Sequence, residues 1–208
     1  MAMRNPPKKR NSNELKRRPI IVIAAEGNNK TERIYFTDFG REYKRAIKWA
    51  PGNYTDPAQM ASVLAETCKS IEWMPEMGDR AYCLIDSDFS CTKDRQIKKA
   101  EQALNEYGMQ LLVSSPCFEI WYLCHHHANA RQYSNAEVIR EVKKYYPAYE
   151  KSLSGMYAAT KERLQTAIQN AEKLRVACMD RGDQPHTVAF RPSTEIDILA
   201  KELMRQER

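Results

Sequence analysis

Apolar residues gather in four short runs along the first part of the chain, and several of these runs are rich in β-branched side chains. The runs cover residues 19–25, 46–50, 80–85 and 109–114, of which the second is the weakest. Between them, apolar positions recur with helical spacing over residues 30–45, 57–73 and 94–107. Continuous apolar runs predict strands buried on both faces, and strands that alternate with helices predict a parallel sheet. The pattern therefore predicts an α/β fold in which a parallel four-stranded sheet is flanked by helices, with right-handed crossovers.

The later part of the chain has helical patterns without strands between them. We expect a helix to open at Pro116, and residues 134–181 to be mostly helical with short breaks. A loop over residues 182–192 then precedes a final helix. At its start we expect Ser193 or Thr194 as the cap and Glu195 as a first-turn acid. Because no linker is evident, residues 19–208 are expected to form one domain with a helical C-terminal extension.

Charge is spread unevenly over the 208 residues, whose formal net charge is +6. The first 18 residues carry seven Lys or Arg and one Glu, and we interpret residues 1–18 as a flexible basic tail. Such a tail suits a polyanion such as nucleic acid, although a solvated terminus explains it equally well. No apolar run approaches the ~20 residues that cross a bilayer. We therefore expect a cytoplasmic protein without a membrane partner.

The six cysteines are scattered, and no pair has CxxC spacing. Cys83 and Cys117 lie in apolar runs and are interpreted as small core residues. Neither a zinc site nor a disulfide framework is predicted.

Acidic residues follow three of the predicted strands. Glu26 ends the first strand, Asp86 and Asp88 end the third, and Glu119 lies in the first turn of the helix after the fourth. In an open α/β sheet, chemistry is usually placed just beyond the carboxyl ends of the strands. Carboxylates that converge there repel one another, and a cation with a preference for hard oxygen ligands relieves that repulsion. The pattern predicts Mg²⁺ or Mn²⁺ bound by Glu26, Asp86 and Asp88, with Glu119 as a further catalytic acid.

Residues beside these acids are candidates for a supporting role or for phosphate binding. Gly27 allows the backbone to bend or a phosphate to approach closely. Lys30 lies at a predicted helix N-terminus, which favours anions, and Glu32 follows in the same helix. Lys93 and Arg95 come soon after the Asp-x-Asp segment and are either phosphate contacts or part of a solvated loop.

Each of these motifs has a simpler interpretation. Asp86 and Asp88 alone would suit a turn and a helix cap. Three adjacent histidines, His125–His127, cannot all face one ion from a regular helix, so a helix end or a surface cluster is favoured. Several aromatic residues either stack on bases or belong to the core. They are Trp121, Tyr122, Tyr145, Tyr146 and Tyr149.

The Glu-Gly after the first strand, the Asp-x-Asp after the third and the strand–helix order resemble the toprim domain of topoisomerases, primases and overcoming-lysogenization-defect nucleases. Four segments resemble the RloB-like family more closely, over roughly residues 19–207. They are Val22–Glu32 with Tyr35–Phe36, Leu84–Phe89, Ser114–Trp121 and Pro192–Thr194. The residues before Glu26 are Ala-Ala, where such families often carry another residue. The chain is too short for the tyrosine-bearing domain of a topoisomerase.

The resemblance implies a metal-dependent nuclease of bacterial phage defence, often encoded in restriction or abortive-infection loci beside an ABC-type ATPase. Its substrate would be RNA, such as tRNA, or DNA. By matching position, Glu26, Asp86 and Asp88 would be metal-binding or catalytic, and Glu119 a further acid. In toprim proteins the first Glu is proposed as general acid or base and the aspartates as metal ligands. The alternative is a non-catalytic toprim-like subunit that binds nucleic acid or a partner ATPase.

Overall fold

Five strands form one sheet in the computed structural model, which describes residues 17–27, 30–88 and 91–205. The strands are β1 (Ile20–Ala25), β2 (Ala46–Trp49), β3 (Arg80–Asp86), β4 (Gln110–Ser115) and β5 (Ser193–Thr194). Their order across the sheet is β2-β1-β3-β4-β5. The first four are parallel, as predicted, and β5 is antiparallel to β4. The predicted α/β fold is confirmed, and a short fifth strand extends it.

The register of the central strands brings their carboxyl ends level. Ala25 of β1 pairs with Leu84 of β3, and Asp86 of β3 pairs with Ser114 of β4. Glu26 directly follows β1. The first acid and the Asp-x-Asp segment therefore leave neighbouring strands at the same edge of the sheet.

Eight helices and two 3-10 turns occupy the rest of the described residues. The helices are α1 (Lys30–Glu42), α2 (Pro57–Ser70), α3 (Cys91–Glu106), α4 (Ile120–Cys124), α5 (Asn135–Tyr145), α6 (Met156–Thr160), α7 (Leu164–Asp180) and α8 (Ile196–Met204). The 3-10 turns are η1 (Pro75–Met77) and η2 (Lys161–Arg163). Asp56 caps α2, since its Oδ1 accepts from the Gln59 amide at 3.0 Å, and Pro57 is the first helical residue.

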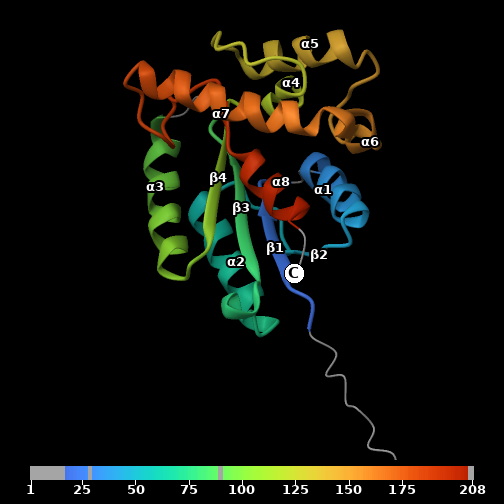
Figure 1. The fold of residues 1–208 in the computed structure, drawn as a ribbon. Coiled ribbons are helices and arrows are strands. Elements are labelled where there is room, and N and C mark those ends of the chain that lie inside the picture. Colours follow the sequence, from blue (N-terminus) through green and yellow to red (C-terminus); the bar gives the residue numbers. More distant parts are fainter. Residues whose placement is uncertain (1–16, 28–29, 89–90, 206–208) are drawn as a thin grey trace, which may run out of the picture.

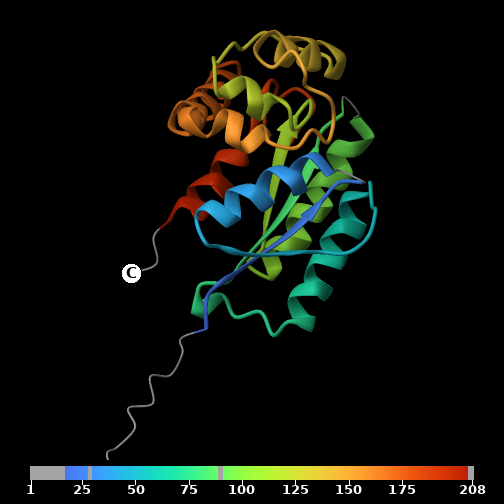
Figure 2. The ribbon, with the colours of Figure 1, turned by 90° about the vertical axis from the view of Figure 1, so that its right-hand side faces the viewer.

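The helices form two layers and a lobe. Figure 1 shows the sheet with the lobe of α4, α5, α6 and α7 beyond the ends of β3 and β4. In the turned view, α1 and α8 cover one face of the sheet while α2 and α3 cover the other (Figure 2). Each face has its own buried apolar cluster, and that of the α1 and α8 face continues into the lobe. The lobe thus lies over the edge at which the acids leave the strands.

Two predicted helix starts are wrong. Pro116 does not open a helix, because the residues after it form a turn in which the Ile120 amide donates to the Cys117 carbonyl, and α4 begins at Ile120. Ser193 and Thr194 do not occupy the N-cap position of the final helix, because their backbones pair with β4 as strand β5, although the Thr194 hydroxyl accepts a hydrogen bond from the Ile196 amide at 3.3 Å. Glu195 occupies the N-cap position of α8, without a capping hydrogen bond from its side chain.

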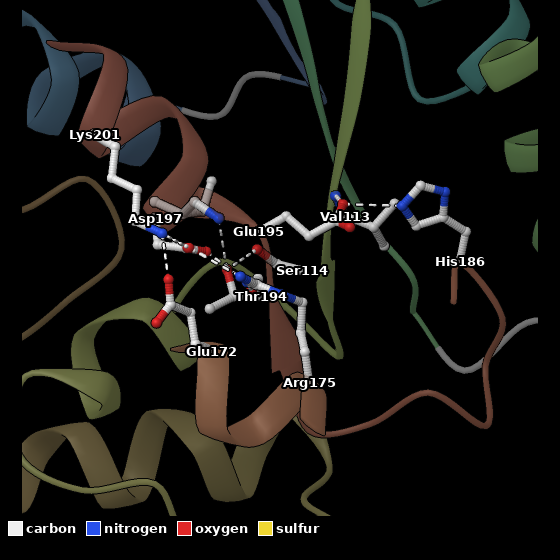
Figure 3. Close-up of polar contacts among 10 residues, drawn as sticks. Val113, Ser114, Glu172, Arg175, His186, Thr194, Glu195, Asp197 and Lys201 are labelled. Atoms are coloured by element: carbon white, nitrogen blue, oxygen red, sulfur yellow. Dashed lines mark hydrogen bonds and ion pairs between the residues drawn. The ribbon is translucent and has the colours of Figure 1, made fainter. Parts of the chain in front are cut away.

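Buried polar contacts fasten this C-terminal part to strand β4 (Figure 3). The hydroxyls of Thr194 and Ser114 are 2.9 Å apart. Arg175 of α7 donates to the Thr194 carbonyl and to Asp197, with 2.9 Å between its Nη2 and Asp197 Oδ2. Asp197 is fully buried. The segment after the loop therefore ties α7 and α8 to the sheet.

Most of the predicted basic tail lies outside the described residues. Arg17, its first described residue, forms a bidentate ion pair with buried Asp79, at 3.0 and 2.9 Å. None of the helices in the described part of the chain has the length and apolarity needed to span a membrane.

Candidate active site

Carboxylates from four segments meet below the lobe, at the edge of the sheet where β1 and β3 end. Glu26 follows β1, and its Oε2 accepts a hydrogen bond from the Asp86 amide at 3.2 Å. Burial raises the pKa of Asp86 well above its usual value, and negative charge on its neighbours raises it further. Those neighbours are Glu32, Glu119, Glu26 and Asp88. The structure thus brings together all four acids predicted as catalytic, with Glu32 as a fifth.

Local backbone geometry fixes the end of β3. The Ser87 amide donates to the Ser114 carbonyl at 3.0 Å, and the Ser87 hydroxyl lies 2.7 Å from that of Ser115. Asp88 then adopts a left-handed conformation, with φ of 49°. Such a conformation is uncommon outside glycine, although Asp tolerates it better than most residues. The chain therefore turns sharply between the two aspartates of the Asp-x-Asp segment.

Gly27 makes the corresponding turn after β1. Its φ is 61°, and its amide donates to the Tyr54 carbonyl at 2.6 Å. A side chain at this φ would be strained, whereas glycine adopts it freely. The predicted bend is therefore present directly after Glu26.

Lys93 lies between Glu26 and Asp88, which we call the outer acids. It belongs to the first turn of α3, and only 7% of it is exposed. Its Nζ donates to Glu26 Oε1 at 2.7 Å, to Glu26 Oε2 at 2.9 Å and to Asp88 Oδ2 at 2.8 Å. Burial raises the pKa of Glu26, and these contacts with Lys93 only partly offset the rise. The ammonium group of Lys93 is thus the cation that lies between the ends of β1 and β3.

No ammonium or guanidinium group of the described residues donates a hydrogen bond to the inner acids, Glu32 and Glu119, although Lys151 lies near them. Glu32 is 3% exposed, and its buried Oε2 accepts no hydrogen bond from the described residues. Burial, together with the charges of Glu119 and Glu26, raises its pKa to about 8. Glu119 accepts a hydrogen bond from the Tyr149 hydroxyl at 2.9 Å. This inner side of the site is a dry environment that disfavours the ionised form of Glu32.

The lobe supplies contacts that the sequence did not indicate. Asn135, the first residue of α5, donates from Nδ2 to Asp88 Oδ1 at 3.2 Å. Burial lowers the pKa of Lys151, but the nearby charges of Glu119, Asp86 and Glu32 outweigh burial and raise it. These residues follow the Asp-x-Asp segment by about 50 to 60 positions. Only the folding of the lobe onto the sheet brings them to the acids, so no local sequence motif predicts their place in the site.

Lys30 and Arg95, both considered for phosphate binding, lie at the surface. Lys30 begins α1, and Arg95 is in α3 two residues after Lys93. Both side chains are exposed, and neither makes a hydrogen bond to an acid among the described residues. Asn28 and Asn29, which join Gly27 to Lys30, lie outside the described residues.

Comparison with known proteins is consistent with this arrangement. The family model described as RloB-like protein matches residues 21–203, which include every acid of the site. The chain belongs to the RloB-like family. No curated protein and no solved structure matches it.

The histidine cluster of this RloB-like chain does not form a metal site. His125 is the C-cap residue of α4, fully buried, and its Nδ1 lies 2.9 Å from the Trp121 carbonyl oxygen. Burial lowers its pKa to about 4. His126 and His127 are partly exposed and lie beside the ring of Tyr145. The trio is thus at a helix end, with its members in different surroundings.

The aromatic candidates separate into two groups. Trp121, Tyr122 and Tyr149 are buried in the core. Tyr145 is exposed and Tyr146 is partly exposed, both at the end of α5. Only the second group is available for stacking on a base.

The oxygen atoms of this RloB-like site suit a divalent metal ion, although they are not already arranged around one point. Within the described residues, no group of three or more His, Cys, Asp or Glu side chains is arranged as a metal site. The donors are nevertheless hard carboxylate oxygens, which Mg²⁺ and Mn²⁺ prefer. Two observations favour a cation here: the raised pKa of Asp86 and the unpartnered oxygen of Glu32. Glu26, Asp86 and Asp88 would hold the ion once Lys93 moved away from them.

Proposed function

We propose that this RloB-like protein is a metal-dependent nuclease of toprim type, which hydrolyses phosphodiester bonds in RNA, such as tRNA, or in DNA. The observation that carries this proposal is the convergence of Glu26, Asp86 and Asp88 at the carboxyl ends of parallel strands. Burial and the charges of the neighbouring acids raise the pKa of Asp86, and Lys93 already fills a cation position beside Glu26 and Asp88. A divalent ion would favour the ionised form of these carboxyl groups, which burial disfavours.

When bound by Glu26, Asp86 and Asp88, Mg²⁺ or Mn²⁺ supplies a Lewis acid and lowers the pKa of a bound water. Glu26 has a raised pKa, so its carboxyl group is suited to take or give a proton as general acid or base. Lys93, once released from the carboxylates, would place its ammonium group against a phosphate oxygen. Glu119 is held in place by the hydrogen bond from the Tyr149 hydroxyl.

Membership of the RloB-like family supports a proposal for the biological setting. We propose that the protein is an effector of bacterial phage defence and that an ABC-type ATPase encoded beside it controls its activity. The alternative is a non-catalytic subunit that binds nucleic acid or the ATPase. That alternative is favoured by one observation: Lys93 neutralises Glu26 and Asp88 without any metal.

A cleavage assay tests the nuclease proposal. Purified protein is incubated with labelled tRNA and with plasmid, in Mg²⁺ or Mn²⁺, with and without the neighbouring ATPase. We expect cleavage that Asp86→Asn lowers by at least about a hundredfold, the scale of losing a group that stabilises transition-state charge. Asp180→Asn, on the exposed surface of α7, is the matched control and should cleave like wild type. Equal cleavage by Asp86→Asn and wild type would refute the metal site, and no cleavage under any condition would favour the non-catalytic alternative.

A further inference from the structure

Four rings form an accessible group on the outside of the lobe. They are His126, His127, Tyr145 and Tyr146, which we call the ring platform. The rings of His126 and Tyr145 are stacked, with centroids 3.8 Å apart and an angle of 11° between their planes. Tyr145 is 43% exposed, in contrast to the buried aromatic residues of the core. Through Tyr145, the platform therefore presents an aromatic ring to solvent.

The platform is held in place and is uncharged near neutral pH. His126 Nε2 lies 2.9 Å from the Tyr146 hydroxyl, which fixes the two rings relative to each other. Burial and the positive charge of Arg163 lower the pKa of His126. Burial also lowers that of His127, with a further contribution from Lys144. Neutral rings in fixed positions are suited to stacking against another flat, uncharged ring.

Free positive charge lies beside the platform. Arg163, in η2, is exposed, and its charge acts on both His126 and Tyr146. Lys143, in the last turn of α5, is also exposed. Neither side chain has a hydrogen bond or ion pair within the part of the chain that the structure describes. Two cations are thus available to an anionic partner at this surface.

Helix α5 connects the platform to the acidic site. Its first residue, Asn135, donates to Asp88, and its last residue is Tyr145. At about 1.5 Å per residue, the helix spans roughly 16 Å between them. A chain of a few nucleotides bound along α5 would therefore reach from the platform to the carboxylates.

We propose that the ring platform binds an unpaired base of single-stranded nucleic acid, while Arg163 and Lys143 contact the adjacent phosphates. Exposed aromatic faces beside cations are the features that bind unpaired bases and their backbone. A duplex keeps its bases stacked on one another and offers none to the platform. The inference deepens the proposed function, since it assigns the substrate's unpaired segment, but binding at the platform requires no metal and no catalysis.

A binding measurement without metal tests the platform separately from the acidic site. Fluorescence anisotropy is recorded for a labelled single-stranded RNA, a single-stranded DNA and a duplex DNA, all in excess EDTA. We expect Tyr145→Ala to weaken binding of the single strands by roughly tenfold, as for the loss of one stacked base, and to leave duplex binding unchanged. Tyr145→Phe keeps the ring and should bind like wild type. Arg163→Ala should lower the slope of log affinity against log salt by roughly one.

Two matched controls lie in or directly after α3, outside the lobe. Tyr107→Ala removes an aromatic ring that is 59% exposed after the end of α3, and Lys99→Ala removes an exposed cation within α3. Both should bind the single strands like wild type.

Three outcomes would overturn the proposal. The first is equal binding of the single-stranded probes by Tyr145→Ala and wild type. The second is an absence of single-strand binding by wild type in EDTA. The third is a Tyr145→Ala variant that keeps its nucleic-acid affinity but no longer co-purifies with the ATPase, which would make the platform a protein contact. Weaker single-strand binding by Tyr145→Ala in a protein that cleaves nothing would uphold the platform and refute the nuclease.

Discussion

At the scale of single residues, Lys93 is the group that most changes the picture of the site. The sequence places it five positions after Asp88, where a solvated loop was favoured over a phosphate contact. In the structure it is buried in α3 and donates to both Glu26 and Asp88. An ammonium group at this point opposes a metal ion at the same carboxylates, because both cations need the same oxygens.

Replacement of Lys93 should therefore strengthen metal binding. We expect Lys93→Met to bind Mn²⁺ roughly tenfold more tightly than wild type, since the carboxylates are left repelling one another with no competing cation. The measurement is a titration of free Mn²⁺ by electron paramagnetic resonance, with Lys99→Met as the control. Unchanged or weaker Mn²⁺ binding by Lys93→Met would show that the lysine is a partner of the ion and not its competitor.

At the scale of elements, the loop between α7 and β5 is pinned by His186. Its Nδ1 lies 3.1 Å from Glu101 of α3, and its Nε2 lies 2.9 Å from Glu195. Glu195 also accepts a hydrogen bond from the Val113 amide of β4, at 2.9 Å (Figure 3). In the same loop, the Val188 amide donates to Asp94, next to Lys93 in α3. One imidazole thus joins the C-terminal part to the helix that carries Lys93.

The stability of this connection should depend on pH. Burial opposes a charge on His186, but Glu195 and Glu101 outweigh burial and raise its pKa to about 9. Because this value lies above that of an unfolded histidine, about 6.5, the contribution is complete below about pH 6.5 and is lost as pH rises through about 9. Urea unfolding should show wild type losing up to about 3 kcal/mol more than His186→Gln between about pH 6 and pH 10. Equal losses in the two proteins would contradict the ion pairs.

Local patterns predicted most of the elements, and one of the misses has a clear tertiary cause. The β-branched runs and helical periodicity gave the four parallel strands and the helices between them. Ser193 and Thr194 carried a capping signature, but tertiary pairing with Ser114 and Ser115 made them a strand. A two-residue strand has no periodicity of its own, so only its neighbour defines it.

At the scale of the whole molecule, local sequence patterns likewise predicted only part of the site. The topology rule for parallel sheets was enough to place Glu26, Asp86 and Asp88 at one edge. The contributions of Asn135, Tyr149 and Lys151 depend on how the lobe folds over that edge. Long-range packing of this kind leaves no spacing signal in the chain. The sheet supplies the acids, while the lobe supplies their surroundings and the ring platform.

The central claim is that the acids bind a divalent metal ion, and direct calorimetry tests it most simply. Wild type, Asp86→Asn and Asp180→Asn are each titrated with Mg²⁺ and Mn²⁺ by isothermal titration calorimetry at neutral pH. We predict binding by wild type and by Asp180→Asn, and a loss of roughly ten- to a hundredfold or more in affinity for Asp86→Asn, as for removal of a group that tunes a metal site. Metal binding of equal strength by Asp86→Asn and wild type, or none by wild type, would contradict the account.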